Sequence, residues 1–81
     1  MRWISMKIVE IKDYGKVIIK LKEYMDTNGI SRNSLAVDAN TRFEVVDKWY
    51  KGDVEKLDLD VLARFCYVLE CGIDDIIEYV K

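Results

Sequence analysis

Residues 30–52 read Ile30-Ser31-Arg32-Asn33-Ser34-Leu35-Ala36-Val37-Asp38-Ala39-Asn40-Thr41-Arg42-Phe43-Glu44-Val45-Val46-Asp47-Lys48-Trp49-Tyr50-Lys51-Gly52. The pattern predicts two short helices joined by a tight turn. Ser31 can cap the first, because a serine hydroxyl accepts a hydrogen bond from a free N–H of a first helical turn. Ala36 is small enough for a close helix crossing, and Asn40 tolerates the positive φ of a turn. We therefore expect a helix-turn-helix over residues 31–50.

The second helix of this pair is expected to present a polar start and to bury its later half. Thr41 and Glu44 fit a capping box, in which each side chain accepts a hydrogen bond from the backbone N–H of the other residue. Val46 and Trp49 have the spacing of a buried stripe, and Gly52 should stop the helix. The exposed start is the part that could reach the edges of DNA bases.

Three more helices are expected around this pair. Apolar residues recur at helical spacing from Lys16 to Asn28, and Gly29 follows as a stop. Asp58 can cap a fourth helix that ends at Gly72, and Asp74 can cap a short fifth helix with Ile73 as a hydrophobic staple. The apolar faces of these last two helices would comprise Leu59, Leu62, Cys66 and Leu69, then Ile76, Ile77 and Val80.

Residues 4–12 are β-branched and roughly alternating, which predicts a strand, and residues 13–15 form a turn-like end. Everything after them reads as helix, so such a strand would lack a partner within the chain. Either it is a disordered arm, or it pairs with the same strand of a second subunit; we favour the second. The fold expected is thus all-α, a compact five-helix domain over 16–81 with an N-terminal strand arm over 1–15. The arm would form a homodimer by burying Trp3, Ile4, Met6 and Ile8.

Composition sets limits on function. The 81 residues allow one domain, and the formal charge of −2 argues against a protein that coats nucleic acid indiscriminately. The charge is uneven: seven Lys/Arg against four Asp/Glu in residues 1–32 give +3, three against three in 33–52 give 0, and three against eight in 53–81 give −5. The acidic last third should point away from any DNA.

Two cysteines and no histidine offer too few ligands for a zinc site, so no metal is expected. Cys66 and Cys71 are predicted to be reduced and packed as small hydrophobic residues. No apolar run approaches the ~20 residues that cross a bilayer, which predicts a cytoplasmic protein without membrane contact. Without a histidine, an activated thiolate or a Gly-rich phosphate loop, we expect no enzyme, no cofactor and no catalytic residue.

Two stretches resemble the lambda-repressor/Cro-like (XRE-type) helix-turn-helix family. The first is residues 30–52. The second is Leu57-Asp58-Leu59-Asp60-Val61-Leu62-Ala63-Arg64-Phe65-Cys66-Tyr67-Val68-Leu69-Glu70-Cys71-Gly72-Ile73-Asp74-Asp75-Ile76-Ile77-Glu78-Tyr79. The resemblance covers about Val17 to Tyr79. It implies a five-helix DNA-binding domain whose third helix, about 42–50, enters the major groove of double-stranded DNA.

The resemblance also implies roles for individual residues. The base-facing set would be Arg42, Phe43, Glu44 and Lys48, and the phosphate-facing set would be Arg32, Asn33, Lys51 and Lys56. Arg42 or Lys48 could pair with guanine, Glu44 could accept from cytosine, and Phe43 could contact a thymine methyl. Arg32 replaces the family's usual glutamine and Asn40 its usual glycine. The carboxylates of Glu44 and Asp47 near the groove lower nonspecific affinity.

Several of these residues have a second interpretation. Glu44 could be held by the capping box, Phe43 could belong to a protein interface, and Arg42 and Lys48 could be solvated charges. The predicted function is a sequence-specific transcriptional regulator, a repressor by occlusion, whose dimer places two recognition helices ~34 Å apart on a palindromic site. The alternative is a helix-turn-helix scaffold that binds proteins, in the manner of an anti-repressor or antitoxin; the low basicity and Phe43 favour it.

Overall fold

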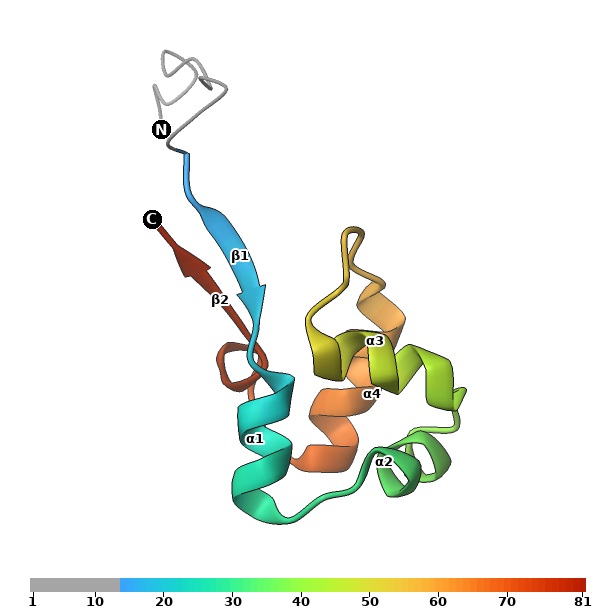
Figure 1. The fold of residues 1–81 in the computed structure, drawn as a ribbon. Helices are drawn as coiled ribbons and strands as arrows, with labels where there is room; N and C mark the ends of the chain where they lie inside the picture. Colours follow the sequence, from blue (N-terminus) through green and yellow to red (C-terminus); the bar gives the residue numbers. More distant parts are fainter. Residues whose placement is uncertain (1–13) are drawn as a thin grey trace.

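A computed structural model describes residues 14–81 of the protein (Figure 1). Four α-helices, one 3₁₀ turn and two strands follow one another along this part of the chain. They are β1 (Lys16–Ile19), α1 (Leu21–Asn28), α2 (Arg32–Asp38), α3 (Phe43–Lys51), α4 (Leu59–Leu69), η2 (Ile73–Asp75) and β2 (Ile77–Val80). The strand expected at residues 4–12, and the dimer contacts expected of Trp3, Ile4, Met6 and Ile8, lie outside the described residues.

β1 and β2 form a two-stranded antiparallel sheet in which Lys16 pairs with Val80 and Ile19 with Ile77. The all-α, five-helix expectation is wrong on this point. Residues 16–19 were expected to begin the first helix, and residues 76–80 to form the last one. Both segments are rich in β-branched and aromatic residues, which favour strands, and short apolar runs fit either period. Figure 1 shows the sheet extending from the α1 side of the helices.

The segment between α4 and β2 also differs from expectation. Glu70, in a left-handed conformation with φ 53°, ends α4 before Gly72 is reached. The backbone N–H of Gly72 donates to Asp75 Oδ2 at 3.1 Å, so Asp75, and not Asp74, closes the following turn. That turn is the single 3₁₀ turn η2, and Ile73 is 55% exposed instead of acting as a staple. A short turn here frees the residues after it to pair with β1.

The core lies where the helices meet. The Trp49 ring of α3 packs edge-on against Phe65 of α4, with ring centroids 5.2 Å apart and planes at 86°. An edge-to-face arrangement is favoured because the positive rim of one ring meets the negative face of the other. The predicted burial of Val46 and Trp49 is confirmed. The buried core comprises Leu21, Met25, Leu35, Ala36, Ala39, Val46, Trp49, Leu62, Phe65, Leu69 and Ile76.

The apolar face of α4 agrees with the prediction at Leu62 and Leu69 and differs from it at two other positions. Phe65 is fully buried whereas Leu59 is 72% exposed.

Cys66 and Cys71 are free thiols, half-buried against the core. Burial, followed by the nearby Cys66 and Asp75, raises the pKa of the Cys71 thiol to about 11. This thiol is therefore protonated at neutral pH and packs as a small hydrophobic group.

Replacement of Gly15 tests the packing at the start of the sheet. Gly15 has φ +85°, and an added Cβ would lie 2.6 Å from the Val80 carbonyl oxygen. Gly29 has φ +66° with no atom within 4 Å of such a Cβ, so Gly29→Ala isolates the cost of the left-handed backbone. That cost is about 1–2 kcal/mol. We expect Gly15→Ala to lower the free energy of unfolding by more, measured by urea denaturation with circular dichroism; equal losses would contradict the packing.

Candidate nucleic-acid interface

α2 and α3 form the helix-turn-helix that the sequence predicts. Ser31 Oγ accepts a hydrogen bond from the backbone N–H of Ser34 at 3.1 Å, which confirms the predicted cap. Asn40 has φ 54°, the positive value expected in the turn. The guanidinium of Arg64, on α4, donates to the carbonyl oxygens of Ala39 and Asn40 at 3.2 and 2.8 Å. The turn is thus fixed to α4.

Sequence reasoning missed this role of Arg64. The local signal is only Asp60, four residues earlier, whose Oδ2 accepts from Arg64 Nε at 2.9 Å. That spacing predicts an ion pair along one face of a helix. It does not predict that the other end of the guanidinium reaches a turn far away in the sequence.

The start of α3 corrects the predicted capping box. The N-cap is Arg42 in an extended conformation, with no side-chain hydrogen bond to the first turn, so Thr41 does not cap α3. The helix begins one residue later than the box requires, and an arginine side chain has no acceptor oxygen to offer a free N–H. Glu44 is exposed in the first turn, where its charge favours the positive end of the helix.

The four residues expected to face bases, Arg42, Phe43, Glu44 and Lys48, are all exposed in the structure. Arg42 is the N-cap of α3, Phe43 and Glu44 lie in its first turn, and Lys48 lies in its last turn. Val46 and Trp49 are buried on the other side of the helix. Phe43 is 42% exposed. Within residues 14–81, neither Arg42 nor Lys48 takes part in a salt bridge. Both cations are therefore available to a ligand.

The expected phosphate-facing residues are not equivalent. Asn33, Lys51 and Lys56 are exposed and Arg32 is half-exposed. Arg32 Nη1 lies 2.6 Å from Asp47 Oδ1, and Lys51 Nζ lies 3.1 Å from Asp47 Oδ2. Arg32 is the first residue of α2 and Lys51 the last residue of α3, so the sequence predicts two separate contacts. The structure brings both side chains together on one carboxylate.

Arg32 is also held by aromatic rings. Its guanidinium lies 4.8 Å from the centroid of the Tyr50 ring and 5.7 Å from that of Phe43. A cation near an aromatic face is attracted by the negative charge of that face. Tyr50 is fixed in turn, because its hydroxyl donates to Asp26 Oδ1 of α1 at 2.8 Å. This hydrogen bond raises the pKa of Tyr50, and the bonds from Lys22 and Tyr50 lower the pKa of Asp26.

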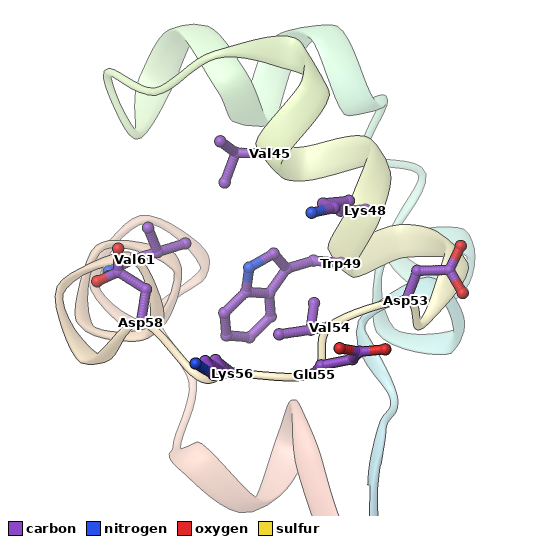
Figure 2. A pocket seen from close by; sticks show the side chains of 9 residues that line it. All are labelled: Val45, Lys48, Trp49, Asp53, Val54, Glu55, Lys56, Asp58 and Val61. Carbon is purple, nitrogen blue, oxygen red and sulfur yellow. The ribbon is translucent and has the colours of Figure 1, made fainter.

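An open hollow of about 620 Å³ lies between α3, α4 and the loop that joins them (Figure 2). Figure 2 shows the Trp49 ring projecting from α3 towards this space, with Lys48 and Lys56 at its border. Asp58, which also lines it, caps α4 as predicted: Oδ1 accepts from the N–H groups of Asp60 and Val61 at 3.0 and 3.3 Å. The lining residues are Val45, Lys48, Trp49, Asp53, Val54, Glu55, Lys56, Asp58 and Val61.

Over residues 14–81 there is no group of three or more cysteine, aspartate or glutamate side chains placed to hold a metal ion. In the same part of the chain, no helix has the length and apolar character needed to cross a membrane.

Comparison with known proteins agrees with this geometry. The family described as the Cro/C1-type HTH DNA-binding domain matches residues 20–81, and the chain belongs to this family. A crystal structure described as that of a candidate DNA-binding protein from Bacteroides fragilis is similar in fold. It has a TM-score of 0.68 at 14% identity, and the match covers 78% of this chain and 100% of that one. No curated protein sequence matched the chain.

The ion pairs of Asp47 predict a measurable titration. Lys51, together with Arg32, holds the pKa of this carboxyl below its ordinary value. Because the folded-state pKa is lowered, the stabilisation is present above the pKa of the unfolded chain and is lost as pH falls through the folded value. Carboxyl NMR titration should show a higher Asp47 pKa in Lys51→Gln and in Arg32→Gln. Lys48→Gln, which removes an unpaired cation, should leave it nearly unchanged; no rise in either paired variant would contradict the contacts.

Proposed function

We propose that the protein is a sequence-specific DNA-binding transcriptional regulator, non-enzymatic, that inserts α3 into the major groove and represses by occlusion. The observation that carries the proposal is how neighbouring residues hold α3 in the fold. Its inner side is anchored through Trp49, and its preceding turn is held by Arg64. Its outer side is exposed, with Arg42 at the start and Lys48 in the last turn both unpaired within residues 14–81. A rigid helix with a free polar start has the form needed to read base edges.

The proposed base contacts are Arg42, Phe43, Glu44 and Lys48. Arg42 and Lys48 suit the guanine acceptors O6 and N7, Glu44 suits the cytosine amino group, and Phe43 suits a thymine methyl. Glu44 is not held in a capping box, so its carboxylate is available to a base, which supports its place in this set. The proposed phosphate contacts are Arg32, Asn33, Lys51 and Lys56, which lie at the start of α2, at the end of α3 and in the loop after it.

The distribution of charge supports this orientation. The acidic residues of the last third of the chain lie on α4, η2, β2 and the loops around them. Figure 1 shows β2 on the α1 side of the molecule, away from α2. A duplex approaching α2 and the start of α3 would thus lie away from β2, although Asp53, Glu55 and Asp58 are beside Lys48 and Lys56 around the hollow.

Fluorescence anisotropy tests the proposal. The labelled probe is the DNA that flanks the protein's own coding region, and a scrambled duplex of equal length is the control. We expect tight binding to the flanking DNA that weakens as salt rises, because binding releases counterions from phosphates. Equal affinity for the scrambled duplex, or no binding to either, would exclude sequence-specific regulation.

Two lysines separate base contact from phosphate contact within the same assay. Lys48→Ala should reduce the preference for the flanking DNA by roughly tenfold, since a good base contact contributes ~1–3 kcal/mol of discrimination. Lys51→Ala should weaken binding to both duplexes alike and reduce the salt slope by about one. The same pattern for both variants would mean that α3 does not lie in the groove as proposed.

We further propose that residues 1–15 form an arm, that residues 16–81 form the helix-turn-helix domain, and that the protein acts as a homodimer through Trp3, Ile4, Met6 and Ile8. The sequence predicted no second strand in the chain with which the arm could pair. The structure has a two-stranded sheet, and the edge of β1 offers such a partner, so the homodimer no longer follows from the lack of one. Analytical ultracentrifugation tests the homodimer by comparing the full chain with a form that lacks residues 1–13. We expect dimer and monomer respectively; self-association without residues 1–13 would contradict the arm.

A protein-binding scaffold is the second candidate function. Its support is Phe43, which is 42% exposed in the middle of the proposed reading surface, and the low basicity of the chain. Loss of binding to every duplex in the anisotropy assay would favour this candidate over DNA binding.

A further inference from the structure

We propose that Asp47 acts as a built-in substitute for a DNA phosphate: it holds Arg32 and Lys51 in the free protein, and the DNA backbone must displace it to bind these cations. The inference rests on the proposed function and deepens it. Arg32 and Lys51 are two of the four proposed phosphate contacts, so the exchange would set the affinity for DNA.

The geometry of the carboxylate is that of a bridging anion. Asp47 Oδ1 lies 2.6 Å from Arg32 Nη1, and Oδ2 lies 3.1 Å from Lys51 Nζ. A phosphate likewise presents anionic oxygens to arginine and lysine donors. The other salt bridges of residues 14–81 each join one acid to one base: Lys20 with Glu78, Lys22 with Asp26 and Arg64 with Asp60. Asp47 alone among them holds two cations.

Exposure determines which partner DNA would meet first. The Asp47 side chain is 24% exposed, whereas those of Arg32 and Lys51 are 40% and 60% exposed. The cations are thus more open to solvent than the carboxylate between them. Surface ion pairs contribute little to stability, so a phosphate arriving from outside can replace Asp47 without disturbing the core.

The rings beside Arg32 keep it ready for this exchange. Tyr50 and Phe43 flank the guanidinium, and the hydrogen bond from Tyr50 to Asp26 fixes one of these rings to α1. Arg32 therefore keeps its position when Asp47 is displaced. A guanidinium carries five N–H donors, and the bond to Asp47 occupies a donor on Nη1 only. The remaining donors can engage an incoming phosphate before the carboxylate leaves.

The exchange predicts a gain of affinity when the carboxylate is removed. Asp47→Asn leaves the size of the side chain unchanged and releases both cations. We expect roughly tenfold tighter binding at each salt concentration, because the wild type must break two surface ion pairs before DNA can bind the same cations. The log–log salt slope should stay close to that of the wild type, since the number of neutralised phosphates is unchanged. The gain should be equal for the flanking and the scrambled duplex, because phosphates carry no sequence information.

The matched control is Asp74→Asn, which also changes the net charge by one. Asp74 lies on η2, outside α2, α3 and the loop after α3, and makes no salt bridge within residues 14–81. Anisotropy titrations over a salt series compare both variants with the wild type, and circular dichroism verifies that each is folded. A larger gain in affinity for Asp47→Asn than for Asp74→Asn supports the exchange. Equal changes, or weaker binding by Asp47→Asn, overturn it.

A second pair of variants keeps the test independent of any loss of stability. Arg32→Gln should weaken DNA binding more in the Asp47→Asn background than in the wild type, because only there is Arg32 fully free; equal losses overturn the inference. If the wild type fails to bind and Asp47→Asn binds, Asp47 masks the surface and the exchange is supported. If neither binds any duplex, the proposed function fails, and the exchange with it; binding by the wild type without a gain in Asp47→Asn overturns the exchange alone.

Discussion

The edge-to-face contact between Trp49 and Phe65 determines how the rest of the molecule presents itself. Trp49 is the buried residue nearest the end of α3, and Phe65 lies in the middle of α4. Arg64, the neighbour of Phe65, reaches the turn that precedes α3. One segment of α4 thus fixes α3 from two directions, through an apolar contact and through hydrogen bonds to backbone carbonyls. These contacts hold the buried side of α3 and leave its polar start exposed.

Local rules explain which parts of the fold could be predicted from the sequence. The Ser31 cap, the positive φ of Asn40 and the burial of Val46 each depend on a few neighbouring residues, and all were predicted correctly. The capping box at Thr41 failed because a shift of one residue is enough to remove it. The sheet was missed for another reason: Val17 pairs with Tyr79, and no local signal reports a partner so distant in the chain.

The candidate interface likewise has parts that the sequence predicts and parts that it does not. The exposure of Arg42 at the start of α3 and of Lys48 in its last turn follows from helical periodicity once the buried stripe is known. Asp47 and Lys51 are four residues apart on one helix, so their ion pair is also accessible to sequence reasoning. The bond from Arg32 to Asp47 depends on how α2 crosses α3, and the tertiary fold alone supplies that information. Of the two carboxylates on α3, that of Asp47 is therefore balanced by cations within the protein.

The sheet between β1 and β2 carries a consequence for the order in which the chain folds. Contacts among α1, α2 and α3 join segments close in sequence, which cost little loop entropy and form quickly. β1 and β2 are separated by all four helices, so their pairing closes the longest loop of the described chain. A two-stranded ribbon is only marginally stable by itself, so the two strands are expected to pair once the packed helices bring them together. We therefore expect the sheet to assemble last, after the helices have packed.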